Sequence, residues 1–300
     1  MHTGTHASPG SNARPESRVR DFTAMLEVEI AGDHIDLPSF PEVALRVRRA
    51  LADENVTIDQ VVRVVSAEPS LVVRLLQLGN SAALNPSGRR LTDLRAAMTR
   101  IGFNMARSAT IAFAMSQLRR AEAYRGLEKP FNELWHSSIN VAAVSYVLAK
   151  RLTKTNAELA LLAGLLHTVG KLYLLTRAAR FPDLLNDARV YPGLVETWHA
   201  RIAQAILVNW ELAPRVIDAV RGFEAADRER EGDIDLLDVL WVAKCLTAQP
   251  RKTWSEAPAM PPEWFESHPA RRLGLDAATC QQVLLESERD IDSLASALAD

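Results

Sequence analysis

The chain has 300 residues, of which 48% are hydrophobic and 24% are charged. This composition can bury a sizeable core and excludes a wholly disordered chain. The formal net charge of -2 excludes a general electrostatic attraction to nucleic acid or anionic membranes, and two cysteines are too few for a disulfide framework. We therefore expect a cytoplasmic protein with reduced thiols and no membrane span.

The first segment, residues 1 to about 20, is rich in Ser, Gly, Pro, Thr and Arg. It has almost no large apolar side chains that could repay the entropy of ordering, so we expect a disordered tail. Beyond it, apolar residues recur at helical spacing and the alternation typical of strands is nearly absent. The sequence therefore predicts an all-α fold.

Helix-start signals divide the first half of the chain into separate predicted helices. Thr57 and Gln60 form a capping box before the apolar run VVRVV, and Pro69 opens a segment that ends near Asn80. Further helices are expected at about 93–101, 103–120, 131–152, 156–168, 196–210, 214–222, 234–248 and 276–298.

Two stretches punctuate the helical pattern. AYRGLEKP, at about 123–130, separates an N-terminal helical part (about 34–122) from a second helical bundle (about 125–225). The densely charged EAADREREGD, at 224–233, predicts a solvent-exposed boundary. We thus expect one domain over 21–230, built of two helical subdomains, followed by a C-terminal helical extension over 231–300.

The stretch GLLHTVGK, residues 164–171, is where catalytic chemistry would be expected. A divalent-metal phosphohydrolase needs ligands for its ion, and adjacent His and Asp residues supply an imidazole and a charge-compensating carboxylate. Here His167 is followed by Thr168, a neutral hydroxyl. His136 and His199 also lie on predicted helices, so three imidazoles could converge in one core. The alternative is packing, because His199 shares its helical face with apolar residues.

Lys171, at the end of the same stretch, has two interpretations. It either faces a pocket, where its ammonium would meet a phosphate as a point charge, or caps the C-terminus of a helix near Gly170. We favour the cap.

Several blocks follow one another in a specific order over residues 34–225. They are LPSFPEVALRV, SAEPSLVVRLLQLGNSA, LTDLRAAMTRIG, FNELWHSSINVAAVSYVLAKR, GLLHTVGKLYLL and HARIAQAILVNWELAPRVIDAV. Together they resemble the HDOD family, the non-catalytic relatives of the HD-type phosphohydrolases. The resemblance places His136 at the family's first histidine and Thr168 at the aspartate of the HD motif. RGFEAA stands where a His-His pair often follows, so each departure removes a metal ligand.

The resemblance implies a bacterial signal-transduction module that acts through protein contacts and not as an enzyme. We therefore expect no cofactor and no metal, and a protein partner in trans, such as a sensor, a receiver or a cyclic-di-GMP-related protein. The degenerate pocket would be vestigial or would sense a small ligand. Its residues would be His136, His167, Thr168, Lys171 and His199.

A residual hydrolase is the first alternative. It would use His136, His167 and His199 around one ion, with a carboxylate supplied from elsewhere, such as Glu196 or Asp183.

DNA binding is the second alternative, because LTDLRAAMTRIGFNMARSATIAFAM has a helix–Gly-turn–helix outline. Its second helix carries Ile111, Phe113 and Met115 where a recognition helix would expose polar side chains, so we expect no nucleic-acid partner. The basic residues near this outline are Arg89, Arg90, Arg95, Arg100 and Arg107.

Overall fold

A computed structural model of the chain describes residues 15–32, 35, 37, 41–53, 55–225, 229–248, 253–254 and 260–299. Within these ranges every regular element is a helix, which confirms the all-α prediction.

The predicted disordered tail is only partly covered: residues 1–14 lie outside the described residues, and residues 15–20 belong to a helix, α1 (Pro15–Ala31). For 15–20 the prediction of disorder was wrong. Phe22 and Leu26, further along α1, bury their side chains completely and anchor it.

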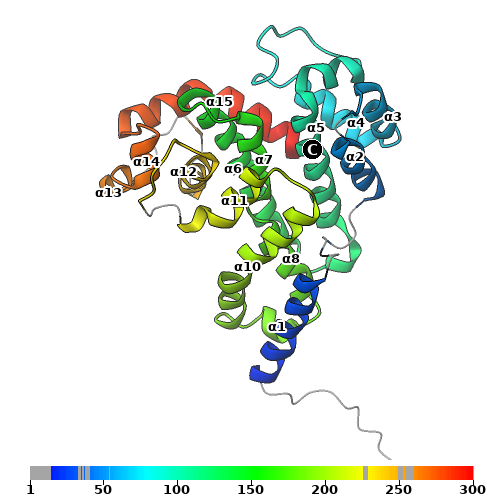
Figure 1. The fold of residues 1–300 in the computed structure, drawn as a ribbon, viewed down its shortest axis with the longest axis vertical. Coiled ribbons are helices and arrows are strands. Elements are labelled where there is room, and N and C mark those ends of the chain that lie inside the picture. The colour runs from blue at the N-terminus through cyan, green and yellow to red at the C-terminus, as the bar shows by residue number, and fades with distance from the viewer. Residues whose placement is uncertain are drawn as a thin grey trace, which may run out of the picture.

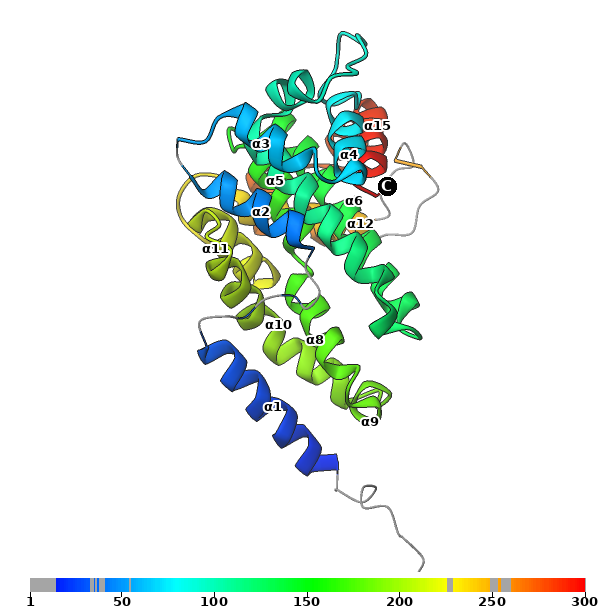
Figure 2. The same ribbon diagram turned by 90° about the vertical axis from the view of Figure 1, so that its right-hand side faces the viewer.

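The N-terminal part of the domain gathers four helices around the longest of them (Figures 1 and 2). These are α2 (Glu42–Ala52), α3 (Ile58–Val65), α4 (Pro69–Gly79) and α5 (Leu94–Arg120). The predicted capping box begins α3, since the Gln60 N–H donates to Thr57 Oγ1 at 3.3 Å and the Thr57 N–H to Gln60 Oε1 at 2.7 Å. Gly102 has a positive φ of 70° and kinks α5 between the two predicted helices.

The second part is built on the long helix α6 (Glu128–Leu152), which packs against α7 (Ala157–Leu166), α12 (Leu236–Ala248) and α15 (Ala277–Ala299). A short 3₁₀ turn, η1 (Glu122–Tyr124), leads into it, and a second, η2 (Phe223–Ala225), closes this part. The other helices are α7 (Ala157–Leu166), α8 (Val169–Ala178), α9 (Pro182–Leu185), α10 (Val190–Asn209) and α11 (Pro214–Gly222). In Figure 2, α1 lies beside α10 and α9.

Two glycines of GLLHTVGK allow helices to approach closely. A Cβ on Gly164 would lie 2.6 Å from the Cα of Ala142 on α6, and a Cβ on Gly170 would lie 1.9 Å from the backbone oxygen of His199 on α10. Any larger side chain at either position would push the helices apart. The turn between α7 and α8 is therefore held between α6 and α10.

The C-terminal residues are part of the same body. They form α12 (Leu236–Ala248), α13 (Pro262–Phe265), α14 (His268–Arg272) and α15 (Ala277–Ala299). Helix α12 packs on α6, α7 and α11, while α15 crosses α6 and reaches α4 and α5 (Figure 1). The predicted extension thus covers the second subdomain and bridges to the first.

One apolar stretch, Ala157–Ala178, passes a length and hydropathy test for a membrane span. The sequence reasoning had expected no run of this length. Its most apolar window is 89% buried inside the fold, as for a core helix, and the turn between α7 and α8 interrupts it.

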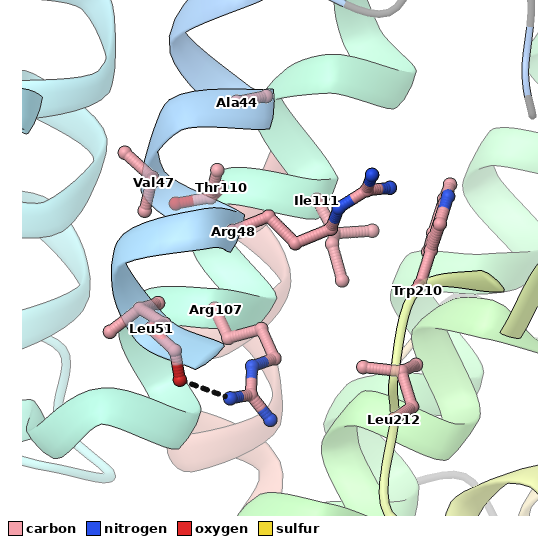
Figure 3. A pocket seen from close by; sticks show the side chains of 9 residues that line it. All are labelled: Ala44, Val47, Arg48, Leu51, Arg107, Thr110, Ile111, Trp210 and Leu212. Atoms are coloured by element: carbon pink, nitrogen blue, oxygen red, sulfur yellow. Dashed lines mark hydrogen bonds between the residues drawn. The ribbon is translucent and has the colours of Figure 1, made fainter. Parts of the chain in front are cut away.

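The two parts of the domain meet where α2 and α5 face the end of α10 (Figure 3). The Arg48 guanidinium lies 5.8 Å from the centre of the Trp210 ring, and Arg107 Nη2 donates to the backbone oxygen of Leu51 at 3.0 Å. The cavity between these side chains measures about 10 Å³. It has room for about one water molecule and is a packing gap, not a small-molecule site.

Candidate functional site

A larger cavity of about 330 Å³ opens where α6, α8, α10 and α12 meet, at the turn that carries His167. Its size is at the lower end of small-molecule pockets, which span roughly 300–1,000 Å³. It is lined by Pro130, Glu133, Leu134, Ser137, His167, Thr168, Lys171, Leu175, Tyr191, Val195 and Lys244.

His167 is the innermost titratable group of this cavity, with 1% of its surface exposed. Its Nδ1 lies 2.7 Å from the backbone oxygen of Gly164, and because a carbonyl only accepts, Nδ1 carries the proton. Nε2 is then an acceptor and faces Ser137 Oγ at 3.4 Å. Burial, with the Lys244 ammonium second, lowers the pKa of His167 from 6.5 to about 3. The imidazole is therefore neutral at physiological pH.

A lysine from α12 stands beside this imidazole. Lys244 Nζ donates a hydrogen bond to Ser137 Oγ at 3.0 Å. The Ser137 hydroxyl can then donate its own hydrogen bond to His167 Nε2. Burial lowers the pKa of Lys244, and the nearby Lys171 lowers it further. Thr168 is also buried, and its hydroxyl bonds to Ser138 Oγ on α6. The Thr168 side chain is thus held by a neighbouring hydroxyl.

A second cluster lies at the edge of the cavity. Glu224, in η2, accepts from Lys171 Nζ at 2.9 Å and lies 2.8 Å from His199 Nε2. The His199 hydrogen bond lowers the pKa of Glu224 to about 2, and the Lys171 bond acts in the same direction. His199 is only 4% exposed, so it is a buried histidine with a carboxylate partner.

The predicted helix C-cap for Lys171 was wrong: Lys171 lies in the first turn of α8 and lines the cavity.

The family model for the HDOD domain matches residues 37–225. The chain belongs to the HDOD family. The match covers the N-terminal helices and α6 to α11, and it ends just after Glu224. Lys244 and α12 lie outside it, although they complete the cavity of this HDOD domain.

An uncharacterized protein of Treponema pallidum (strain Nichols) is 24% identical over 217 residues, which are 68% of this chain and 40% of that protein. The chain therefore spans well under half of this relative.

Two solved structures share the fold. A candidate metal-dependent phosphohydrolase of Shewanella amazonensis SB2B has a TM-score of 0.70 at 24% identity, covering 94% of this chain and 99% of that one. A candidate signal transduction protein of Marinobacter aquaeolei VT8 has a TM-score of 0.58 at 20% identity, covering 96% of this chain and 67% of that one. At these identities the likeness establishes the helical fold.

The HDOD cavity does not contain every predicted site residue. His167, Thr168 and Lys171 line it, and His199 reaches its edge through Glu224. His136 is exposed on α6 and does not line the cavity. The residue that faces His167 is Ser137, one position later, and one position on a helix is a rotation of about 100°. The three predicted imidazoles therefore do not converge.

The donor set of this HDOD domain does not fit a divalent metal. Besides the His167 imidazole, the cavity is lined by hydroxyls, two ammoniums that would repel a dication, and one exposed carboxylate. These polar groups belong to Ser137, Thr168, Tyr191, Lys171, Lys244 and Glu133. Among the described residues, no three His, Cys, Asp or Glu side chains are grouped so that they could hold a metal ion. Neither predicted carboxylate helps, because Asp183 pairs with Arg18 and Glu196 is exposed outside the cavity.

Sequence reasoning missed three residues of the site, Ser137, Glu224 and Lys244. For Ser137 a signal existed, since Pro130, Leu134 and Ser137 recur at helical spacing on the face that lines the cavity. Glu224 and Lys244 come from η2 and α12, and only the tertiary fold brings these segments to the cavity. The dense charge at 224–233 predicts solvent exposure for Glu224 and not a place beside the cavity.

The helix–turn–helix outline of α5 offers no recognition face. Met105, Ala109, Ala112 and Phe113 in its second half are buried in the core. Three of the nearby arginines are engaged within the chain: Arg95 pairs with Asp59, Arg100 donates to the Gly79 carbonyl, and Arg107 donates to the Leu51 carbonyl. A helix packed in this way cannot enter a major groove.

Proposed function

We propose that this HDOD domain is a non-enzymatic regulatory module of bacterial signal transduction, which works in the cytoplasm through contacts with other proteins in trans. The observation that carries the proposal is the cavity at His167. A metal-dependent phosphohydrolase requires anionic or imidazole ligands around its ion. This cavity presents hydroxyls and two ammoniums beside a single neutral imidazole, and its one lining carboxylate, Glu133, is exposed.

Further observations support the same proposal. Family membership favours a signalling role, and so does the fold shared with a protein named as a candidate in signal transduction. Cys245 and Cys280 are both reduced cysteines, in keeping with a reducing compartment. Without metal ligands in the cavity, the domain would act on its protein partners through its surface and its conformational state.

Metal analysis combined with hydrolysis assays tests the proposal. The purified full chain should carry no stoichiometric transition metal, and it should not hydrolyse nucleotides or cyclic dinucleotides with Mg²⁺, Mn²⁺, Zn²⁺ or Fe²⁺. Wild type and His167→Ala should give the same background rate. A bound transition metal together with turnover that disappears in His167→Ala would overturn the proposal and favour the residual hydrolase.

A further inference from the structure

The starting observation is a partly buried cation that forms no salt bridge within the described residues, although the Glu224 carboxylate nearby favours its charged form. Lys244 is only partly exposed on α12, and its ammonium donates a hydrogen bond to the neutral Ser137 hydroxyl at 3.0 Å. Among the described residues, no carboxylate forms a salt bridge with it. Its neighbour Lys171 is already paired with Glu224, which also holds His199. A buried charge is unfavourable unless an opposite charge or several hydrogen bonds compensate it.

The surroundings of Lys244 provide room for such a counter-ion. The ammonium lines the cavity of about 330 Å³, and Lys171 lines it from the first turn of α8. The amino-terminal end of this ten-residue helix adds partial positive charge. The Glu133 carboxylate at the cavity is exposed, so water and salt screen it. The deep end is thus cationic.

The rest of the cavity is apolar. Leu134, Leu175 and Val195 supply aliphatic surface, and Tyr191 adds an aromatic ring. Such a cavity suits a molecule with one anionic end and a compact body that has an apolar or aromatic face. Its volume is close to the lower limit for small-molecule pockets, so a cyclic dinucleotide would not be enclosed.

We propose that this cavity binds a small phosphate monoester, with the Lys244 ammonium as the principal counter-ion and Lys171 as the second cation. A phosphate is favoured over a carboxylate because its three terminal oxygens can accept from groups on α6, α8 and α12 at once. The ammonium thereby takes the place that a metal ion would take beside an imidazole. The inference rests on the proposed function, since it treats the cavity as a sensor that does not turn its ligand over.

Isothermal titration calorimetry on the full chain, in EDTA and at constant ionic strength, tests this proposal. The probes are AMP, inorganic phosphate, adenosine and succinate. We expect AMP and phosphate to bind, and adenosine and succinate to bind at least tenfold more weakly. Lys244→Met should weaken AMP binding by about tenfold or more, the usual effect of losing one charged hydrogen bond. Lys244→Arg should retain binding.

Lys150→Met is the matched control, because Lys150 also donates to a neutral group, the Ala83 carbonyl at 3.1 Å, but lies away from the cavity. It should leave AMP affinity unchanged. A melting curve adds a second readout: without ligand, Lys244→Met should melt at or above the wild-type temperature, because it removes an uncompensated charge. Phosphate should raise the melting temperature of wild type but not of this variant.

Several outcomes would overturn the inference. They are no binding of AMP or phosphate by wild type, equal binding by Lys244→Met, tighter binding of succinate than of phosphate, and a clear fall in the melting temperature of unliganded Lys244→Met. Each of these leaves the non-enzymatic proposal standing. Conversely, AMP that binds through Lys244 but is hydrolysed when metal is restored would overturn the proposed function and leave the anion site in place.

Discussion

At the scale of single residues, the hydroxyls and ammonium groups that line the cavity with His167 determine what it can bind. Ser137, Thr168 and Lys244 line the same cavity as His167, and Lys244 and His167 both contact the Ser137 hydroxyl. Sequence reasoning identified the loss at Thr168, since it is visible in the motif itself. It could not identify Lys244, which comes from a helix 77 positions after His167 in the numbering.

Replacing the hydroxyls and the Lys244 ammonium by metal ligands should create a metal site. The triple variant Ser137→His, Thr168→Asp, Lys244→Asp would place two imidazoles and two carboxylates around the cavity, a common set for divalent metals. We expect its Zn²⁺ or Mn²⁺ affinity to exceed that of wild type by about a hundredfold or more, since even outer-shell partners change metal affinity by about 10- to 100-fold. Calorimetry with each metal measures this.

His136→Ala in the triple variant is the control for that experiment. His136 is exposed outside the cavity, so its removal should not change the gained affinity. A loss of metal binding on this change would mean that His136, and not position 137, faces the site.

The neutral state of His167 predicts a pH dependence of stability. At pH 7 the imidazole is unprotonated in the folded and unfolded chains alike. Below pH 6.5 the unfolded chain takes up a proton that the folded chain rejects down to about pH 3, so stability falls over that window. Between pH 7 and pH 5 the free energy of unfolding should fall by about 2 kcal/mol more in wild type than in His167→Gln.

Urea unfolding at both pH values measures this difference. The range stops at pH 5 because Glu224, whose pKa is lowered from 4.5 to about 2, contributes its own loss of stability only below pH 4.5. The same pH slope in both proteins would show that His167 is protonated in the fold near its ordinary pKa.

At the scale of helices, local signals predicted most elements because each depends on neighbouring residues. The Thr57–Gln60 capping box and the Gly102 break are of this kind, and both occur in the structure. Helix α8 was not predicted, since GKLYLL continues the apolar pattern of α7 and only the turn at His167 separates the two. That turn is set by contacts with α6 and α10, which no local pattern contains.

Gly170 should be intolerant of any side chain. The added Cβ of Gly170→Ala would lie 1.9 Å from the His199 backbone oxygen, so α8 and α10 must separate. We expect a loss of about 1–3 kcal/mol or more in the free energy of unfolding, as for an overpacked core. Gly193→Ala on α10 is the control, since its Cβ meets nothing within 4 Å. It should be neutral or stabilising by up to about 1 kcal/mol in a urea titration.

At the scale of the whole molecule, the C-terminal residues connect the two subdomains. Helix α12 carries Lys244 to the cavity, and α15 lies across α6, α4 and α5 (Figure 1). The family match ends at residue 225, yet these helices pack into the same core as the matched part. Packed contacts thus run from the cavity through α12 and α6 to α15.

Deletion of residues 277–300 should unfold the domain. Helix α15 buries four large aliphatic side chains completely, those of Leu284, Ile291, Leu294 and Leu298. At roughly 1.5–3 kcal/mol each they contribute about 6–12 kcal/mol. That is comparable to the entire stability of a typical domain, about 5–15 kcal/mol. The truncated chain should lose cooperative unfolding and bind the dye ANS, as chains with exposed apolar surface do.

Point variants in the full chain measure how much individual α15 side chains contribute to the free energy of unfolding. Leu294→Ala should lower the free energy of unfolding by about 2–5 kcal/mol. Leu285→Ala, at a position that is 53% exposed on the same helix, should change it by less than about 0.5 kcal/mol. A truncated chain that still unfolds cooperatively, with Leu294→Ala no worse than Leu285→Ala, would mean that α15 only rests on an independently stable HDOD core. The cavity would then have to signal through the remaining helices.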